Sequence, residues 1–503
     1  MISKRRINVV CTGVARGAPS GRWRAVMANR DLCFAPAMEL GKLYRVRKVS
    51  PLEVMQAVLA RIDQVNPAVN AYVTVARESA LRAARAATRV LRRGATLPPL
   101  FGVPVSIKDL EPTRGIRTTW GSKIFEHHVP DEDALVVERL KAAGAIVVGK
   151  TNTPEFGAGA NTFNAVFGAT RNPWNPALTC GGSSGGAAVA LAAGMGPIAQ
   201  GSDLGGSLRI PAAFCGVVGF RTTPGLIPVY PRELAWDFFS VTGPMARSVA
   251  DVALMLSVMA GPDDRAPLSY AVDTRLFLKA VKNPSVRGWR IAWTPDLNGL
   301  IPVDPEVAKV AEGACKLFRS LGARVEAACC DFSEVNDIVL ATRGLRMVAL
   351  HADKLARWKG EMQKGLVWNI EQGLRLTPQE IGRGEKLRTK LWHRVRTFME
   401  THDLMILPTV AVPPFPVEQP YPVEINGKKL ENYTQWFLLT YGISVTGLPA
   451  ISVPCGFTQS GLPVGLQIVG RRRQEVAVLA AAAAFEAAAP WSDRLPPIVG
   501  GRG

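Results

Sequence analysis

The chain has 503 residues, of which 48% are hydrophobic and 20% are charged, an ordinary globular composition that allows a sizeable core. Lys and Arg (60) exceed Asp and Glu (41), giving a net charge of +19. Charge of one sign never runs to six residues, so an arginine-rich surface is favoured over a binding site for nucleic acid or acidic lipid. No uninterrupted apolar stretch reaches the length of a transmembrane helix.

The eight cysteines are scattered, without C-x-x-C or Cys/His zinc spacing. They are typical of reduced thiols in a cytoplasmic protein without a metal site. Residues 1–34 are predicted to be a basic, disordered N-terminal extension, with Met27 as an alternative start. Patterned sequence begins near residue 35.

The first predicted elements alternate between helix and strand. Ser50-Pro51-Leu52-Glu53 is a capping box with proline at the first helical position, and it starts an amphipathic helix. Helical spacing continues to Val65, and Asn66-Pro67 is expected to end this helix. The next predictions are a helix over 77–93, a strand over 101–107, a helix over 133–143 and a strand over 145–151.

The later part of the chain continues the alternation. We expect helices over 304–320, 377–400 and 474–487, and strands over 404–410, 450–457 and 464–470. This alternation predicts a layered α/β/α fold. No internal repeat or sharp change of composition divides the chain, so residues 35–495 are predicted to form one domain.

Lys108 is unusual because it follows an apolar strand in the stretch FGVPVSIKDL (101–110). Lysine is among the residues least often fully buried. Two interpretations are open from spacing alone. Lys108 pairs with Asp109 or extends to solvent, or it is buried where a low dielectric lowers its pKa and makes it a base.

Two stretches rich in glycine and serine stand out, CGGSSGGAA (180–188) and GSDLGGSLRIPA (201–212). Glycine clusters mark tight turns or a close approach of backbone to ligand. The flanking segments are apolar and must pack, which argues against flexible linkers. Neither stretch has the lysine of a phosphate-binding P-loop or the G-x-G-x-x-G of a dinucleotide site.

The segment 181–185 fits G-x-S-x-G, the nucleophile motif of α/β-hydrolases, which would make Ser183 the nucleophile of an esterase. That enzyme needs a downstream acid and histidine. The later histidines lie in or beside charged helical segments, where surface or helix-face positions are expected: His351, His393 and His402. A serine nucleophile without histidine would need another base, and a neutral lysine is one.

The chain resembles the amidase signature family, hydrolases with a Ser–cis-Ser–Lys triad, from about residue 35 to 490. The resemblance rests on GVPVSIKD, GGSSGG, GSDLGGS and RIPAAFCGVVG, and near the C-terminus on TGLPAISVPCGF and GLPVGLQIVG. It implies a three-layer α/β/α fold with a large central mixed sheet.

The resemblance also implies a role for each residue of the triad. Ser207 would be the nucleophile, Ser183 the bridging serine after a cis Gly182–Ser183 peptide, and Lys108 the base. Protons would pass from Ser207 to Ser183 to Lys108 while Ser207 attacks the amide carbonyl and forms an acyl-enzyme. The oxyanion would be stabilised by the backbone N–H groups of Leu204, Gly205, Gly206 and Ser207.

Neighbouring residues are expected to support this site. Ser184 and Asp203 would hold the loop, and Arg209 would be structural. Cys180 and Ser202 depart from the family, where proline and threonine are common, and neither is expected to touch the triad. No metal or organic cofactor is required.

Several aromatic residues are candidates for the walls of a substrate pocket, with core packing as the alternative: Trp236, Phe238, Phe239, Tyr433, Trp436, Phe437 and Tyr441. They suggest an apolar or aryl amide. The predicted activity is hydrolysis of a small linear carboxylic amide to a carboxylate and ammonia or an amine. The resemblance also implies a homodimer.

Two further functions remain as alternatives. The positive charge would suit the glutaminase component of a tRNA-dependent amidotransferase, but the expected Glu-Ala-Ser-Ser-Asn segment is missing, and residues 360–376 resemble stand-alone amidases. A basic nucleic-acid-binding protein without enzyme activity is opposed by the complete triad. No nucleic-acid or membrane partner is predicted.

Overall fold

The computed structural model describes residues 32–93 and 96–500. The predicted N-terminal extension lies outside these residues except for Leu32–Phe34, which forms the 3-10 helix η1 with Cys33 buried. Within the described ranges, no helix is long and apolar enough to cross a membrane.

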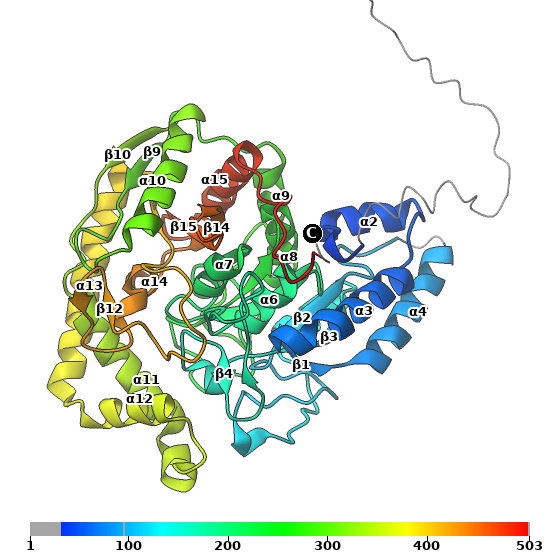
Figure 1. The fold of residues 1–503 in the computed structure, drawn as a ribbon, viewed down its shortest axis with the longest axis horizontal. Helices are drawn as coiled ribbons and strands as arrows, with labels where there is room; N and C mark the ends of the chain where they lie inside the picture. Colours follow the sequence, from blue (N-terminus) through cyan, green and yellow to red (C-terminus); the bar gives the residue numbers. More distant parts are fainter. Residues whose placement is uncertain (1–31, 94–95, 501–503) are drawn as a thin grey trace, which may run out of the picture.

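An 11-stranded mixed sheet runs through the molecule in the order β1-β3-β2-β6-β8-β7-β14-β15-β11-β9-β10 (Figure 1). The groups β3-β2-β6 and β11-β9-β10 are parallel, and the other neighbours are antiparallel. The strands are β1 Tyr72–Val75, β2 Pro104–Lys108, β3 Ile146–Thr151, β6 Ile198–Asp203, β7 Val218–Arg221, β8 Val241–Ala246, β9 Arg290–Trp293, β10 Arg324–Ala327, β11 Leu404–Pro408, β14 Ala450–Phe457 and β15 Pro463–Gly470.

Helices pack against this sheet to give the predicted α/β fold (Figure 1). In the view of Figure 1 the blue helices α2–α4 and the yellow helices α11–α13 lie at opposite ends. The helices are α2 Ala37–Arg45, α3 Pro51–Val69, α4 Arg77–Arg93, α5 Leu135–Ala142, α6 Gly185–Ala192, α7 Arg209–Cys215, α8 Val249–Met259, α9 Arg275–Lys282, α10 Pro305–Ser320, α11 Val335–Trp358, α12 Lys364–Arg375, α13 Pro378–Thr401, α14 Leu438–Thr446 and α15 Glu475–Ala488.

The capping box at the start of α3 forms as predicted, with Ser50 accepting from the Glu53 N–H. The predicted end of this helix at Asn66-Pro67 is wrong, because α3 continues to Val69. Pro67 falls in the last turn, where the carbonyl it would clash with belongs to the exposed residue Asp63. The Asn66 side chain instead accepts from the N–H groups of Ala71 and Tyr72, which shapes the turn into β1.

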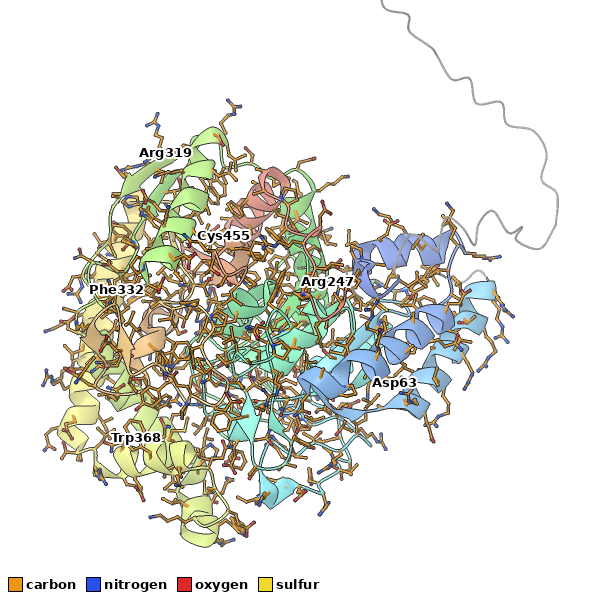
Figure 2. The ribbon with its side chains drawn as sticks, viewed as in Figure 1. Asp63, Arg247, Arg319, Phe332, Trp368 and Cys455 are labelled. Carbon is orange, nitrogen blue, oxygen red and sulfur yellow. The ribbon has the colours of Figure 1, made fainter. Side chains whose placement is uncertain are left out.

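The interior contains two large apolar clusters, one around α3, α6, α8 and α15 and one around α11, α13 and α14. Figure 2 shows Asp63 and Arg319 near the periphery, and Phe332 belongs to the buried interior. The expected surface or helix-face placement holds for His393, which is exposed, but His351 and His402 are buried. The ring of His351 packs on Phe156, and that of His402 stacks on Phe398.

Candidate active site

Lys108 is the last residue of β2 and is fully buried. Its Nζ donates to three hydroxyls, those of Ser183 at 2.7 Å, Ser184 at 3.0 Å and Ser202 at 3.0 Å. Burial lowers the pKa of Lys108 to about 7, although the charges of Glu111 and Asp203 oppose this shift. The amine can therefore be neutral near physiological pH.

The alternative pairing of Lys108 with Asp109 is not found. The Asp109 carboxylate instead accepts from the N–H of Thr119 at 3.2 Å and from its hydroxyl at 2.5 Å. Of the two interpretations of Lys108, the buried amine is the correct one.

Ser183 lies in the turn that leads into α6, and the peptide between Gly182 and Ser183 is cis, as the resemblance implies. Gly182 packs directly against the backbone of the loop after β3. A Cβ at residue 182 would come within 2.8 Å of the Asn161 carbonyl carbon and 3.0 Å of that of Ala160. Glycine is therefore required where the turn brings the Ser183 hydroxyl to Lys108.

Ser202 was not expected to touch the triad, and that expectation is wrong. Strand β6 pairs with β2, which brings the Ser202 hydroxyl to the Lys108 amine. Ser184 also contacts Lys108 directly, and its hydroxyl bonds both the N–H and the C=O of Ser202 at 3.2 Å. Strand β6 and the start of α6 thus bring two further hydroxyls, those of Ser202 and Ser184, within hydrogen-bond distance of the Lys108 amine.

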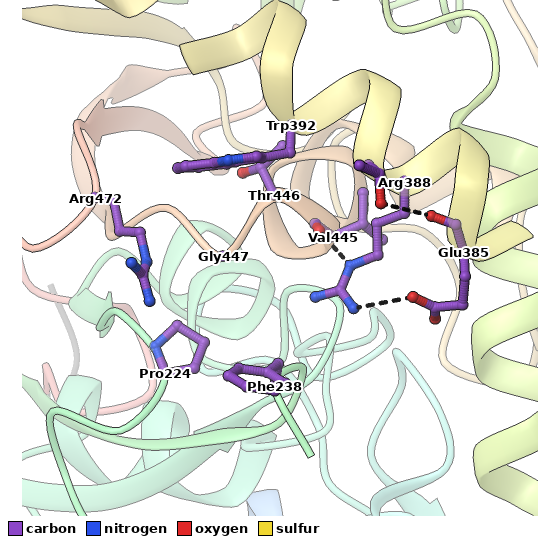
Figure 3. Close-up of a pocket in the computed structure, with 10 residues that line it drawn as sticks. Pro224, Phe238, Glu385, Arg388, Trp392, Val445, Thr446, Gly447 and Arg472 are labelled. Atoms are coloured by element: carbon purple, nitrogen blue, oxygen red, sulfur yellow. Dashed lines mark hydrogen bonds and ion pairs between the residues drawn. The ribbon is translucent and has the colours of Figure 1, made fainter. Parts of the chain in front are cut away.

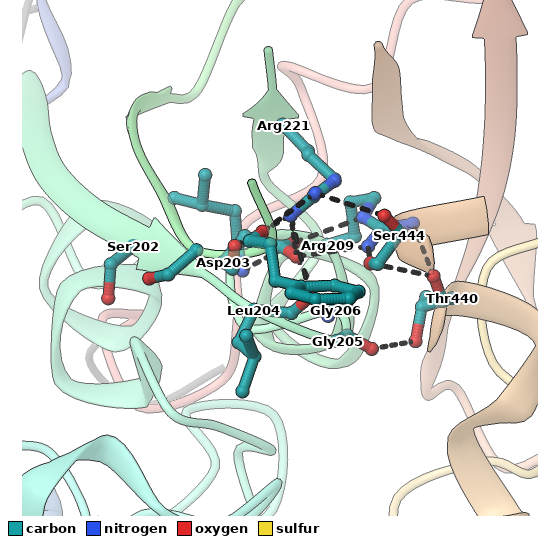
Figure 4. A network of polar contacts seen from close by, with 12 residues as sticks. Ser202, Asp203, Leu204, Gly205, Gly206, Arg209, Arg221, Thr440 and Ser444 are labelled. Atoms are coloured by element: carbon teal, nitrogen blue, oxygen red, sulfur yellow. Dashed lines mark hydrogen bonds and ion pairs between the residues drawn. The ribbon is translucent and has the colours of Figure 1, made fainter. Parts of the chain in front are cut away.

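Asp203 ends β6 and is buried between two arginines, Arg209 at 3.0 Å and Arg221 at 3.1 Å (Figure 4). Burial alone would raise the pKa of Asp203, but the two guanidinium groups outweigh it and hold the pKa well below its usual range. The Asp203 carboxylate also accepts from the N–H groups of Gly206 and Leu208. These contacts support the expected role of Asp203 in holding the loop, with Arg209 as a structural residue.

Loop 203–207 has all its carbonyls engaged. The carbonyls of Asp203 and Leu204 accept from the Arg221 guanidinium, and that of Gly205 accepts from the Thr440 hydroxyl. The carbonyls of Gly206 and Ser207 accept from the N–H groups of Ile210 and Ser184, respectively. Within the described residues, the N–H groups of Leu204, Gly205 and Ser207 have no hydrogen-bond acceptor. The Gly206 N–H differs from the expectation of a free donor, because Asp203 accepts it at 2.8 Å.

Ser207 is half-buried beside these free N–H groups. Its carbonyl accepts from the Ser184 N–H at 3.1 Å, which joins the two serine-containing loops. No hydrogen bond links the hydroxyls of Ser183 and Ser207 in the described part of the chain. Catalytic hydrogen bonds are often long without substrate and tighten in the complex.

Two cavities lie near these residues, and Ser202 lines one of them. The apolar cavity has a volume of about 650 Å³, and its lining includes Ala158, Ala160, Leu366, Trp368, Tyr433 and Trp436. The second cavity has a volume of about 680 Å³, and its lining combines aromatic residues with charged and polar ones, including Trp120, Phe156, Tyr230, Glu111, Ser202, Arg232, Arg346 and His351. Ala160 connects the first to Gly182, and Ser202 connects the second to Lys108.

Of the aromatic residues predicted to bind substrate, Tyr433 and Trp436 line the apolar cavity. Tyr441 is buried, and its ring would lie 2.8 Å from a Cβ added at Gly205. Trp236 is 70% exposed, and Phe238 lines a different cavity of about 290 Å³ between α13 and the turn after α14 (Figure 3). Phe239 is partly buried under Arg388. The segment 236–239 therefore lines neither of these two cavities.

No histidine of the described residues forms a hydrogen bond with Ser183, the serine of the G-x-S-x-G motif. Among the described residues, Lys108 is the hydrogen-bond partner of the Ser183 hydroxyl. No group of three or more His, Cys, Asp or Glu residues in the described ranges could hold a metal ion.

Comparison with known proteins identifies the family. The family model described as Amidase matches residues 53–479. An acylamidase of Rhodococcus erythropolis is 41% identical over 475 residues, covering 93% of this chain and 98% of the relative. A glutamyl-tRNA(Gln) amidotransferase component of Thermosynechococcus vestitus is 36% identical over 478 residues, covering 89% and 97%.

A solved structure agrees with these sequence relatives. A bacterial aryl acylamidase of the amidase signature family has a TM-score of 0.86 at 31% identity, covering 93% of this chain and 99% of that one. The chain belongs to the amidase signature family and is an amide hydrolase.

Proposed function

We propose that this enzyme is an acylamidase that cleaves apolar or aryl amides through an acyl-enzyme on Ser207, with Ser183 and Lys108 as the proton relay. The observation that carries the proposal is the buried Lys108 amine, 2.7 Å from the Ser183 hydroxyl and with its pKa lowered to about 7 by burial. A neutral amine in this position can accept the Ser183 proton without histidine.

The relay works in two directions. Lys108 takes the proton of Ser183, Ser183 takes that of Ser207, and the Ser207 oxygen bonds to the amide carbon. When the C–N bond breaks, the same protons return through Ser183 to the leaving nitrogen, which departs as a neutral amine or ammonia. Water then attacks the acyl ester with the relay again as base, and the carboxylate leaves.

The negative oxygen formed in each attack needs donors that are already oriented. The unengaged N–H groups of Leu204, Gly205 and Ser207 are proposed to bind it. The Gly206 N–H is left out of this set because it donates to Asp203. Because the loop carbonyls are all engaged, their partial negative charges are held away from the oxyanion.

The substrate class is inferred from the apolar cavity. Its aromatic and aliphatic walls favour an apolar or aryl group over a charged one. The relatives named acylamidase and aryl acylamidase support the same class. The amidotransferase relative, at 36% identity, keeps the glutaminase function as a second candidate.

Trapping of the nucleophile tests the proposal. A serine-directed aryl phosphonate is expected to label Ser207, and Ser207→Ala is expected to lose at least about 1,000-fold in kcat while remaining folded. Ser257→Ala is the matched control, since that hydroxyl bonds within α8 and should leave activity unchanged. A label on Ser183, or an active Ser207→Ala enzyme, would refute the assignment.

A panel of substrates distinguishes the acylamidase from the glutaminase function. We expect hydrolysis of aryl and aliphatic amides by the chain alone, with glutamine a poor substrate with or without the other amidotransferase components. The cytoplasmic location and the homodimer remain predictions, which cell fractionation and sedimentation equilibrium would test.

A further inference from the structure

The peptide unit that joins Gly205 to Gly206 is held at both ends. Its C=O accepts from the Thr440 hydroxyl at 2.7 Å, and its N–H donates to Asp203 Oδ1 at 2.8 Å. This peptide is trans, so its C=O and N–H point in opposite directions. The two contacts together therefore fix the orientation of its plane.

Glycine on both sides makes this plane free to rotate unless something holds it. Gly206 has a φ of +133°, in the region that favours glycine. This plane joins the peptides that carry the Gly205 and Ser207 N–H groups through two soft torsions, ψ of Gly205 and φ of Gly206. Holding the central plane restricts both torsions, so the contacts of this peptide help to set the direction of the two free donors.

The contact with α14 is specific to the Thr440 hydroxyl. A Cβ added at Gly206 would lie 2.2 Å from Thr440 Oγ1, so the loop lies directly on this side chain. The hydroxyl proton is shared with the Phe437 carbonyl at 2.9 Å, and the shorter contact is to Gly205. Thr440 therefore has a role beyond packing within its own helix.

Arg209 links Asp203 and Thr440, the two residues that hold the Gly205–Gly206 peptide (Figure 4). Arg209 donates to the Asp203 carboxylate and also to the Thr440 carbonyl at 3.0 Å. It donates further to the Ser444 hydroxyl one turn along α14 at 2.6 Å. Asp203 and Thr440 are thereby held in a fixed relation, with the Gly205–Gly206 peptide between them.

We propose that Thr440 is a positioning residue whose hydroxyl orients the oxyanion donors of Gly205 and Ser207 by holding the Gly205 carbonyl. Thr440 does not touch the reacting atoms. This inference rests on the proposed function, since it assigns a support to the same oxyanion site.

The test compares Thr440→Val, which keeps the shape and removes the donor, with Thr440→Ser, which keeps the donor. We expect kcat of Thr440→Val on an aryl amide to fall about 10- to 100-fold with KM little changed, below the effect of deleting a donor outright. Thr440→Ser should stay close to the wild type. Thr446→Val is the matched control, because that buried hydroxyl on the same helix donates to the Ile443 carbonyl and accepts from the Leu448 N–H, and does not bond the loop.

A second measurement separates orientation from general damage. The affinity for an aryl boronic acid, which forms an anionic tetrahedral adduct with the nucleophile, should fall in Thr440→Val by the same factor as kcat. The affinity for the product carboxylate should not change. Folding is checked by the melting temperature, and Thr440→Ala replaces Thr440→Val if valine prevents folding.

Three outcomes would overturn the inference: unchanged kcat and boronate affinity in Thr440→Val, an equal loss in Thr440→Ser, or an equal loss in Thr446→Val. Phosphonate labelling keeps this separate from the proposed function. If Ser207 is labelled and Ser207→Ala is inactive while Thr440→Val behaves as wild type, only the positioning role fails. If Ser207 is not the labelled serine, the proposed function itself fails.

Discussion

The Lys108 amine is buried among hydroxyls, and no carboxylate of residues 32–93 or 96–500 forms an ion pair with it. Its three hydrogen-bond partners are the neutral side chains of Ser183, Ser184 and Ser202. Hydroxyls can donate to a neutral amine as well as accept from a charged one. Because burial lowers the pKa of Lys108 to about 7, both charge states are accessible within the pH range of an ordinary assay.

The pH dependence of the reaction should report this amine. Only the neutral form can take the Ser183 proton, so kcat/KM should rise about tenfold per pH unit below pH 7 and level off above it. Buried His351 cannot produce this rise, since burial, with the charges of Lys354 and Arg346, lowers its pKa to about 3. A profile of kcat/KM from pH 5.5 to 9 that stays flat or falls would contradict a neutral Lys108 base.

A site residue could be predicted where its neighbours along the chain mark it. Lys108 was singled out because it ends an apolar strand, but Lys150 ends the similar run AIVVGK and was missed. Lys150 is also buried and donates to the hydroxyls of Thr113 and Thr118, and burial lowers its pKa to about 8. The contact of Ser202 with Lys108 could not be predicted, because it arises from the pairing of β2 with β6.

Asp203 connects four elements, a structural role that the motif GSDLGGS alone does not indicate. It lies at the end of β6 and bonds Arg209 of α7, Arg221 of β7 and the loop before α7. Arg209 and Arg221 extend the network to α14 through the hydroxyl and the carbonyl of Ser444, respectively. Removing the Asp203 charge would leave two buried guanidiniums without a counter-ion.

Asp203→Asn should therefore lower both stability and activity. Breaking a buried ion pair by removing one partner costs about 3–5 kcal/mol, and urea unfolding should show a loss of that order. The Gly206 N–H would also lose its charged acceptor, so kcat should fall. Asp273→Asn is the control, since its exposed pairing with Arg275 should contribute nothing measurable. Equal stability of the two variants would contradict the role given to Asp203.

Helices with capping signals and a polar face were predictable, and the fully buried helix α14 was not. Helices α10 and α13 begin with capping signals and have alternating apolar and polar sides, and both lie within a residue or two of their predicted bounds. Helix α14 is buried on every side, so its sequence LLTYGISVT has no amphipathic period, and it was not predicted. Its Thr440 was accordingly absent from the predicted site.

The site depends on a strand order that the sequence does not encode locally. Alternation of helices and strands was sufficient for the α/β class, and the resemblance implied a mixed sheet. The final strands β14 and β15 enter the middle of the sheet, between β7 and β11. This return places α14, which precedes β14, beside the loop that follows β6. Such long-range pairing cannot be read from periodicity.

The apolar cavity is formed in the same way, by segments more than 200 residues apart in the chain. The loop after β3, helix α12 and the segment 420–436 all contribute to its walls. Ala158 is a suitable place to narrow it, because this lining residue is half-buried and a larger side chain has room to turn into the cavity.

Ala158→Phe should change substrate choice more than catalysis. If the cavity holds the apolar group of the substrate, KM for a naphthyl amide should rise about 10-fold or more, while a small aliphatic amide is cleaved as before. Ala83→Phe, on the exposed side of α4, is the control for adding the same ring at a distance from the site. The measurement is the ratio of kcat/KM for the two amides in each variant. An unchanged ratio in Ala158→Phe would show that the substrate binds elsewhere, and the second cavity, which Ser202 lines, would be the next one to narrow.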